Sequence, residues 1–283
     1  MHVQLFFIAM NHSDFFKMLQ NDAELNRTTL NMRACLSKYI TDHRLNSLIL
    51  GISGGIDSAL CAALTKPVCD QLNIPLIGRS ITIESNKKEE VERSLKIGTL
   101  FCHDFQHLDL TSTFYENKKL LIHFDDSALS KMRQGNMKAR MRMMILYDLA
   151  QLYRGIVIST DNYTEYLTGF WTLHGDVGDY APIINLWKSE VFFLSKFLLK
   201  ECDKNQKIAL QQCIDATPED GLGISNSDCD QLGVENYFEA DKILIEYFKG
   251  NKELENHILV KRYLNSDYKR KNPIYISRKD ILK

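Results

Sequence analysis

The stretch LNSLILGISGGIDSALCAALT, residues 45–65, decides the fold. It begins with a short apolar run and ends with an apolar segment rich in helix-forming residues. Gly51, Gly54 and Gly55 lie between the two, where the chain can turn tightly. A strand that turns directly into a helix presents backbone N–H groups and the positive end of the helix dipole to an anion. The stretch therefore predicts a phosphate-binding turn.

The other residues of this turn indicate a metal. Walker A loops end in Gly-Lys-[Ser/Thr] and dinucleotide-binding loops carry G-x-G-x-x-G, and neither pattern is present. The turn instead supplies the hydroxyls of Ser53 and Ser58 and the carboxylate of Asp57. A carboxylate repels phosphate unless a cation lies between them, so Asp57 indicates Mg²⁺ and a Mg-pyrophosphate ligand. The alternative is a plain tight turn in which Asp57 caps the following helix.

Similar short apolar runs recur along the chain. They occupy residues 45–52, 75–83 and 155–159, and each precedes a polar, helix-prone segment. Short apolar runs that alternate with longer helical segments are typical of a parallel sheet covered by helices on both faces. We therefore predict an α/β fold, a Rossmann-like three-layer α/β/α arrangement with a mostly parallel central sheet. Such sheets bind ligands at the carboxyl ends of their strands.

The chain as a whole predicts one domain, residues 1–283, because it has no Pro/Ser/Gly-rich linker and no internal repeat. Apolar positions at helical spacing in residues 13–43 predict two helices within an N-terminal region, 1–43, whose first ten residues form a strand or a helix rather than a secretion signal. Residues 126–154 predict a long helix with a Met-rich core face. The basic tail, residues 251–283, predicts a solvated surface.

Composition excludes several classes of function. Hydrophobic residues make up 45% and charged residues 25% of the 283, the balance of an ordinary globular protein. The 35 Lys and Arg residues are matched by 36 Asp and Glu residues, so no overall positive field exists to hold nucleic acid or an anionic membrane. No stretch reaches the about 18–20 apolar residues of a membrane span. The seven cysteines, without a Cys-x-x-Cys pair, indicate reduced thiols and a cytoplasmic location.

The segment SGGIDS, residues 53–58, resembles the pyrophosphate loop of the ATP pyrophosphatases, enzymes that adenylate a substrate and release pyrophosphate. Four further segments, in the same order and at similar spacing, resemble ammonia-dependent NAD synthetase, a family of that superfamily. They are residues 135–143 (GNMKARMRM), 160–165 (TDNYTE), 168–176 (TGFWTLHGD) and 185–191 (NLWKSEV). Together they are more specific than the loop, which alone does not choose between members.

The resemblance assigns roles at the ATP end of the site. It implies that Asp57 and Glu165 hold Mg²⁺ on the ATP phosphates, and that Lys188 neutralises charge as pyrophosphate leaves. The position of Glu165 agrees independently, because it follows the apolar run 155–159 and so lies at the same sheet edge as the turn. The implied ATP-binding residues are Gly51, Ser53, Gly54, Gly55, Asp57, Ser58, Thr160 and Lys188.

The resemblance also assigns residues to the acid substrate, deamido-NAD. Arg140 would contact it with a planar guanidinium suited to carboxylate or phosphate, and Lys269 would reach its phosphates. Asp176 and Asp179 would lie near the nicotinate end, where a carboxylate can bind ammonium and accept a proton as nitrogen attacks. The implied catalytic residues are Asp57, Lys188 and Asp176.

The chain departs from the family pattern at three places. Many relatives have a substrate-contacting Lys before the Gly-Asp pair, whereas this chain has Leu173 followed by His174. His174 either replaces that cation or is structural. An ATP-contacting Thr of the family corresponds to either Thr217 or Glu219, and Tyr268 stands where relatives often have His. These departures concern the identity of the acid more than the adenylation chemistry.

The resemblance implies that the chain converts deamido-NAD to NAD through an acyl adenylate, using ATP and Mg²⁺ and releasing AMP and pyrophosphate. Ammonia is the implied nitrogen donor, because the core leaves no room for a glutaminase domain, and we expect a homodimer that binds neither nucleic acid nor membrane. Two alternatives stay open: another ATP pyrophosphatase that amidates or thiolates a different substrate, including tRNA, and a nucleotide-binding homologue without catalytic activity. Asp57 and Glu165 argue against the second, since a scaffold needs neither metal ligand.

Overall fold

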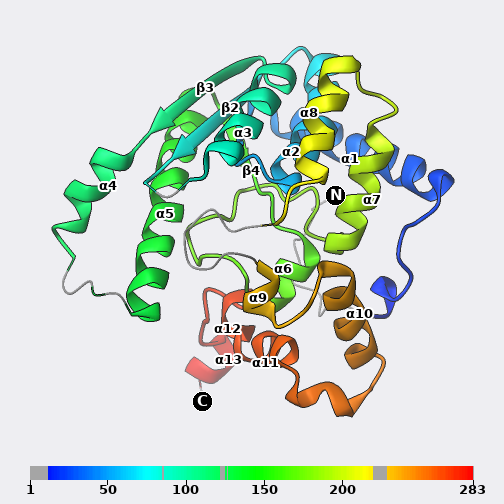
Figure 1. Cartoon of the computed structure of the whole chain (residues 1–283), viewed down its shortest axis with the longest axis vertical. Coiled ribbons are helices and arrows are strands. Elements are labelled where there is room, and N and C mark those ends of the chain that lie inside the picture. The colour runs from blue at the N-terminus through cyan, green and yellow to red at the C-terminus, as the bar shows by residue number, and fades with distance from the viewer. Residues whose placement is uncertain (1–11, 85, 122–124, 126, 219–227, 283) are drawn as a thin grey trace.

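The computed structural model describes residues 12–84, 86–121, 125, 127–218 and 228–282. Within these residues, its centre is an all-parallel four-stranded sheet in the order β3-β2-β1-β4 (Figure 1). The predicted α/β fold with a parallel sheet is confirmed. The strands are β1 (Ser47–Gly51), β2 (Leu76–Thr82), β3 (Asp104–Asp109) and β4 (Gly155–Ile158).

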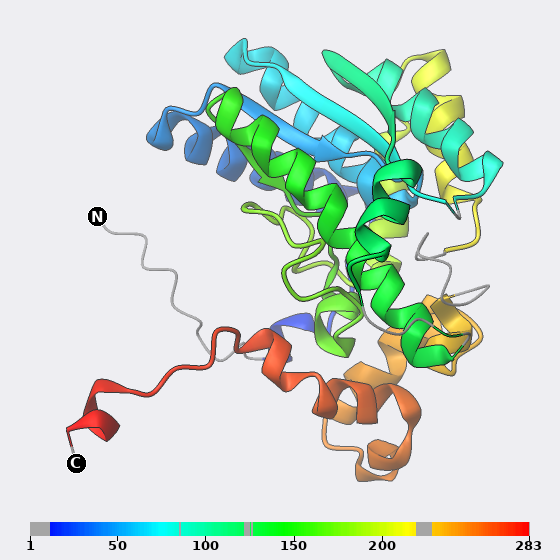
Figure 2. The ribbon, with the colours of Figure 1, turned by 90° about the vertical axis from the view of Figure 1, so that its left-hand side faces the viewer.

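Helices cover both faces of the sheet, as a three-layer fold requires. Leu48 and Leu50 of β1 point into one core and Ile49 points into the other, because successive side chains of a strand alternate between faces. Figure 2 shows α5 on one side of the sheet and α1 on the other. The helices of the first core are α1 (Asp22–His43), α2 (Ile56–Leu72), α3 (Lys88–Phe101), α7 (Lys188–Leu198) and α8 (Lys204–Ile214). Those of the second core are α4 (Thr111–Lys118) and α5 (Ala128–Leu152).

The N-terminal region differs from the prediction. Where two amphipathic helices were predicted, the structure has a single α-helix, α1, preceded by a short 3-10 helix, η1 (His12–Phe15). Asn21 begins α1, and its side-chain oxygen accepts the N–H of Glu24 at 2.9 Å. Phe15 instead stacks on Tyr163, with ring centroids 4.0 Å apart, so its apolar side chain serves a tertiary contact rather than a helix face. The first ten residues lie outside the described part of the chain.

The long helix α5 agrees with the predicted pattern over residues 126–154 to within two residues at each end. Met141 and Met143 pack in the second core, whereas Met132 and Met144 are exposed. The Met-rich face is therefore only partly core. None of the helices in the described ranges combines the length and the apolar character that a membrane span requires.

A third core lies below the carboxyl edge of the sheet and includes the C-terminal helices. Tyr163, Trp187, Leu244 and Leu259 are buried in it. The elements around it are α6 (Tyr163–Thr168), α9 (Asp228–Leu232), α10 (Tyr237–Phe248), η2 (Lys252–Asn256), α11 (Ile258–Asn265) and α12 (Asp267–Arg270). The prediction of a merely solvated surface is thus wrong for α11, which buries Leu259 and Val260. In α12 no residue is fully buried, and Lys269 and Arg270 are half-buried.

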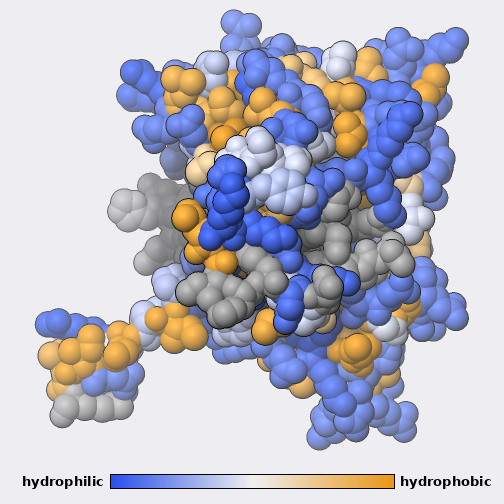
Figure 3. Space-filling view, turned by 60° about the vertical axis from the view of Figure 1, so that its left-hand side comes forward, coloured by the Kyte–Doolittle hydropathy of each residue, from blue (hydrophilic) through white to orange (hydrophobic). Residues whose placement is uncertain are grey.

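The last residues of the chain differ from this packed region. Ile274, Tyr275 and Ile276 are 77%, 82% and 73% exposed. The segment runs away from the rest of the chain to the short helix α13 (Arg278–Ile281), and hydrophobic residues are visible on it in the space-filling view (Figures 2 and 3). Apolar side chains thus remain exposed at this end of the described chain.

Candidate functional site

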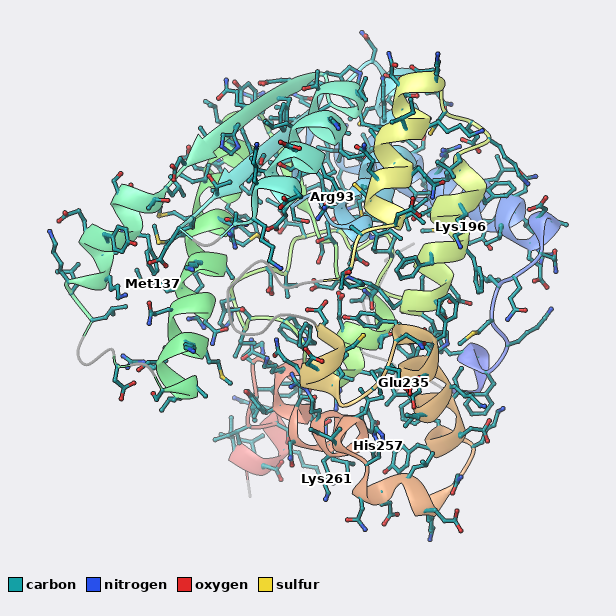
Figure 4. All side chains as sticks on the ribbon, in the orientation of Figure 1. Arg93, Met137, Lys196, Glu235, His257 and Lys261 are labelled. Carbon is teal, nitrogen blue, oxygen red and sulfur yellow. The ribbon has the colours of Figure 1, made fainter. Side chains whose placement is uncertain are left out.

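The glycine-rich turn between β1 and α2 takes its shape from its packing on α3. Gly54 has a φ of +88°, which favours glycine, and a Cβ atom there would lie 2.3 Å from the carbonyl oxygen of Glu90. Arg93 Nε donates a hydrogen bond of 2.9 Å to the carbonyl oxygen of Gly54. In Figure 4, Arg93 points from α3 toward the loops at the centre of the molecule. A side chain at position 54 would therefore force the turn away from α3.

The hydroxyls of the turn organise its backbone. Ser53 Oγ accepts the N–H of Gly55 at 3.2 Å, and Ser58 Oγ accepts the N–H of Ser53 at 3.2 Å. The two hydroxyl oxygens lie 3.0 Å apart, and Ser53 is exposed. Gly51 is the last residue of β1. Amide donors, hydroxyls and the start of α2 thus gather at one end of the sheet, as a phosphate-binding turn requires.

A buried ammonium joins two carboxylates beside this turn. Lys188 Nζ lies 2.5 Å from Asp57 Oδ2 and 2.9 Å from Glu165 Oε1, and Lys188 is only 2% exposed. Asn162 Nδ2 donates to the other oxygen of Asp57 at 3.0 Å. The structure therefore brings together three residues that the sequence placed in the ATP end of the site.

Two helix starts place these groups. Asn162 begins α6: its side-chain oxygen accepts the N–H of Glu165 at 3.1 Å, and Glu165 Oε2 accepts the N–H of Asn162 at 3.4 Å. Lys188 is the first residue of α7. Burial raises the pKa of Glu165 to about 8, against the lowering effect of the Lys188 ammonium. Burial disfavours the ammonium, but Asp57 and Glu165 outweigh this and hold the pKa of Lys188 above its ordinary value.

The donor set of this centre fits Mg²⁺. Asp57 and Glu165 direct oxygens at the same ammonium nitrogen, so both can reach one cation. Among the described residues, no group of three or more His, Cys, Asp or Glu side chains is arranged to hold a metal. Mg²⁺ is usually held by one or two carboxylates together with water and substrate phosphates, so two carboxylates suffice.

A cavity of about 690 Å³ lies between α5 and the C-terminal helices. Arg140 and Lys269 both line it. Arg140 donates to the carbonyl oxygen of Leu173 at 3.3 Å from Nε and 3.1 Å from Nη2. Lys269 Nζ donates to the carbonyl oxygens of Gly169, at 2.7 Å, and Trp171. The two cations thus hold the 169–173 segment while contributing to the cavity wall, and the volume suits a small-molecule ligand.

Two carboxyl groups, the half-buried Asp176 and the buried Asp161, lie near this cavity. Both oxygens of Asp176 accept the N–H of Thr172, at 2.8 and 3.0 Å, and burial raises the pKa of Asp176 to about 7. Asp161 lines the cavity, and its Oδ2 accepts the Ser159 hydroxyl at 2.6 Å. Burial, with the charge of Asp176 added, raises the pKa of Asp161 to about 8. Sequence reasoning missed Asp161, although its position two residues after the 155–159 run was a usable signal.

The family model of NAD synthase matches residues 29–273. The chain belongs to the NAD synthase family. It is thereby a ligase that forms carbon–nitrogen bonds, as the resemblance implied. It is 32% identical over 215 residues to the NH(3)-dependent NAD(+) synthetase of Methanococcoides burtonii, with 76% of each chain covered. It is also 32% identical over 263 residues to that of Pyrococcus horikoshii, with 87% of this chain and 93% of the relative covered.

A solved structure extends this likeness to the fold. The NMN synthetase from Francisella tularensis superposes with a TM-score of 0.75 at 28% identity, covering 89% of this chain and 98% of that one. The parallel α/β fold is thus that of the NAD synthase family, and the Rossmann-like three-layer prediction is confirmed.

The other predicted residues of this NAD synthase family member are placed as follows. Asp179 is tied to the sheet: its carboxylate accepts the N–H of Val157 at 2.9 Å and the hydroxyl of Tyr147 at 3.0 Å. Thr160 directly follows Ser159 after the end of β4 and is half-buried. Its role and that of Asp179 stay predictions.

The departures from the family pattern are also located. Leu173 and His174 line the cavity, whereas Tyr268 is exposed and is not part of its wall. Thr217 is exposed, and Glu219 lies outside the described residues. Among the described residues of the three departures, Leu173 and His174 are therefore the ones that line the cavity.

Proposed function

We propose that the chain catalyses the ATP- and Mg²⁺-dependent amidation of deamido-NAD by ammonia, giving NAD, AMP and pyrophosphate. The observation that carries this proposal is the meeting of Asp57, Glu165 and Lys188 beside the glycine-rich turn. The names of the curated relatives support the acid and the nitrogen donor.

The chemistry requires activation of the acid, because ammonia does not displace oxide from a carboxylate. An oxygen of the nicotinate carboxylate attacks the α-phosphorus of ATP, and the bond from that phosphorus to pyrophosphate breaks. Ammonia then forms a bond to the acyl carbon, the bond from that carbon to AMP breaks, and the nitrogen loses a proton. The products are the amide and AMP.

The residues of the chain position these groups and balance their charge. Lys188 and the amides of the turn stabilise the departing pyrophosphate, and Asp57 with Glu165 would hold Mg²⁺, which supplies positive charge to the phosphates. Arg140 and Lys269 bind the acid in the cavity. Asp176, whose pKa is raised to about 7, is suited to accept the proton from nitrogen near neutral pH. Catalysis then needs no covalent bond to the protein.

A second candidate is the same reaction on nicotinate mononucleotide. The likeness to the NMN synthetase of Francisella tularensis favours it. Leu173 also favours this candidate, because it lines the cavity where many relatives place a lysine. The cavity wall would therefore contact the acid without that cation. Both acids carry the same nicotinate carboxylate, so the adenylation chemistry is unchanged.

The deciding experiment offers both acids, separately, with ATP, Mg²⁺ and ammonium, and measures the amide and AMP. The nicotinate carboxylate is labelled with ¹⁸O, and transfer of one labelled oxygen to AMP is expected, because the acyl adenylate joins that oxygen to the α-phosphorus. Asp57→Asn is the inactive control. Absence of amide from both acids, or AMP without label, would contradict the proposal. Release of pyrophosphate only with another acceptor would favour a different ATP pyrophosphatase. Absence of any pyrophosphate release would favour a nucleotide-binding homologue without catalytic activity.

We further propose that the chain works as a homodimer in the cytoplasm and binds neither nucleic acid nor membrane. The exposed apolar residues Ile274, Tyr275 and Ile276 support an interface between copies, and the seven free cysteines support a reducing compartment. Light scattering should give a mass near twice that of one chain. A monomer at the concentrations used for turnover would contradict the dimer.

A further inference from the structure

Asp241 is a fully buried carboxylate on α10, outside every motif from which the site was predicted. Its Oδ2 accepts the N–H of Ser189 at 2.9 Å, and its Oδ1 accepts the hydroxyl of Thr164 at 2.5 Å. Thr164 Oγ1 in turn accepts the N–H of Lys188 at 3.0 Å. One carboxylate thus satisfies, directly and through one hydroxyl, the first two N–H groups of α7.

These contacts join the two helix starts that hold the charged centre. Lys188 is the first residue of α7, and Thr164 precedes Glu165 in the first turn of α6. The first N–H groups of a helix have no partner within the helix, so the group that accepts them sets where the helix begins in space. A negative group there is also favoured by the helix dipole. Asp241 therefore fixes the backbone of Lys188 relative to that of Glu165.

Helix α10, which carries Asp241, also supports the ammonium group of Lys188. The Lys188 ammonium nitrogen lies 4.9 Å from the centre of the Tyr237 ring, within the range of a cation–π contact. Tyr237 is the first residue of α10, and its hydroxyl donates to Asp228 Oδ2 at 3.0 Å. Helix α10 thus contacts Lys188 at both its backbone, through Asp241 and Thr164, and its side chain, through Tyr237.

We propose that Asp241 is a positioning residue for the ATP end of the site: through Thr164 and Ser189 it places Lys188 opposite Asp57 and Glu165. This inference rests on the proposed function for the role of Lys188. The chemistry needs such support, because the attraction between an ammonium and a phosphate depends on their separation and on how well both are held. Asp241 touches neither substrate nor metal, so it acts only through the two helix starts.

The main variant is Asp241→Asn, which keeps the shape of the side chain but turns one acceptor into a donor. Thr164→Val removes the hydroxyl that links Asp241 to Lys188, and Thr164→Ser retains it. Glu190→Gln is the matched control, because Glu190 is buried on α7 and accepts the N–H groups of Leu19 and Trp187 at 2.8 and 2.9 Å without contacting Thr164. It therefore alters the cap of α7 but not the link between the starts of α6 and α7. Each variant is assayed for kcat and KM, for binding of Mg²⁺ with a non-hydrolysable ATP analogue by calorimetry, and for Tm.

We expect Asp241→Asn and Thr164→Val to lower kcat by about tenfold or more, equal to about 1.4 kcal/mol of transition-state stabilisation, while the KM for the acid stays near that of the unmodified chain. Thr164→Ser should restore kcat, and Glu190→Gln should keep it even where its Tm falls. Unchanged kcat in Asp241→Asn, or an equal loss in Glu190→Gln, would overturn the inference.

If Asp241→Asn does not fold, the comparison of Thr164→Val with Thr164→Ser tests the inference instead. Valine and serine both preserve the size of the buried threonine side chain within one heavy atom. Equal kcat in Thr164→Val and Thr164→Ser would then overturn the inference. If the unmodified chain shows no amidation, the proposed function fails. The calorimetry still tests the positioning, because weaker binding of the Mg²⁺ analogue complex in Asp241→Asn and Thr164→Val, but not in Glu190→Gln, is expected and its absence would refute it.

Discussion

Lys188→Met removes the ammonium that lies between Asp57 and Glu165, at the proposed ATP end of the site. Methionine keeps an unbranched side chain, but the ammonium that lies 2.5 Å from Asp57 and 2.9 Å from Glu165 is lost. Two carboxylates then face one another where Lys188, only 2% exposed, had compensated them. We expect the free energy of unfolding to fall, because charge that is buried without a partner is costly.

The size of the loss follows from burial. Removing one member of a buried ion pair costs about 3–5 kcal/mol. The side chains of Asp57 and Glu165 keep 17% and 14% of their exposure, and Asp57 keeps its bond to Asn162, so the lower end, about 3 kcal/mol, is the better expectation. At about 2–4 °C per kcal/mol, the Tm should fall by about 6–12 °C.

Thermal unfolding, followed by circular dichroism with a chelator present, measures this loss. The double variant Lys188→Met/Asp57→Asn should recover about 2 kcal/mol of it, because one of the two uncompensated carboxylates is gone. Millimolar Mg²⁺ should raise the Tm of Lys188→Met more than that of the unmodified chain, since no ammonium competes for the carboxylates, and should do little in the double variant. An unchanged Tm in Lys188→Met, or a double variant as unstable as the sum of the single ones, would refute the reasoning.

Three further variants test separate parts of the site. Gly54→Ala should lower the rate of pyrophosphate release by more than about tenfold, because the alanine Cβ would lie 2.3 Å from the Glu90 carbonyl oxygen and displace the turn. An unchanged rate would show that the turn need not pack against α3. Burial raises the pKa of Asp161 from 3.8 to about 8, so the free energy of unfolding should fall progressively as the pH rises between those values. Asp161→Asn should flatten this dependence of Tm on pH. An unaltered Tm–pH curve in the variant would contradict the assignment. Lys269→Met should raise the KM for the acid about tenfold and leave the KM for ATP unchanged, because Lys269 holds the Trp171 carbonyl at the cavity wall. Equal changes in the two KM values would refute the assignment of Lys269 to the acid.

The elements found from sequence are those whose signal is local. The strands β1 and β4 appear as short apolar runs, and β2 has apolar residues at both ends with the buried Arg79 and Ser80 between them. The edge strand β3 was not predicted, because its sequence DFQHLD is mostly polar. Parallel strands end at one edge of the sheet, so the sequence places Glu165 at the same edge as the turn that carries Asp57. The pairing of the two carboxylates follows from the family resemblance.

The partners of individual side chains could not be found in this way. Asp179 carries the same sequence signal as Asp176, yet its carboxylate is bound to the backbone of β4, 22 residues earlier in the chain. Asp241 lies in an ordinary amphipathic helix, and only the packing of α10 against α7 gives its carboxylate a role. Such contacts depend on which elements meet in space, and a sequence pattern describes each element separately.

The charge of the whole site limits what can occupy it. Asp57, Asp161, Glu165 and Asp176 interact electrostatically, and within the described residues Lys188 and Lys269 are the ammonium groups that act on them. This excess of carboxylates is one reason that several of their pKa values are raised, because each charge disfavours the next. Under the proposed function, free ATP would add further negative charge, whereas Mg-ATP would bring a divalent cation to the two carboxylates that share Lys188. That cation would leave the ammonium free to compensate the phosphates, so the same lysine can balance the charge of the site in both states.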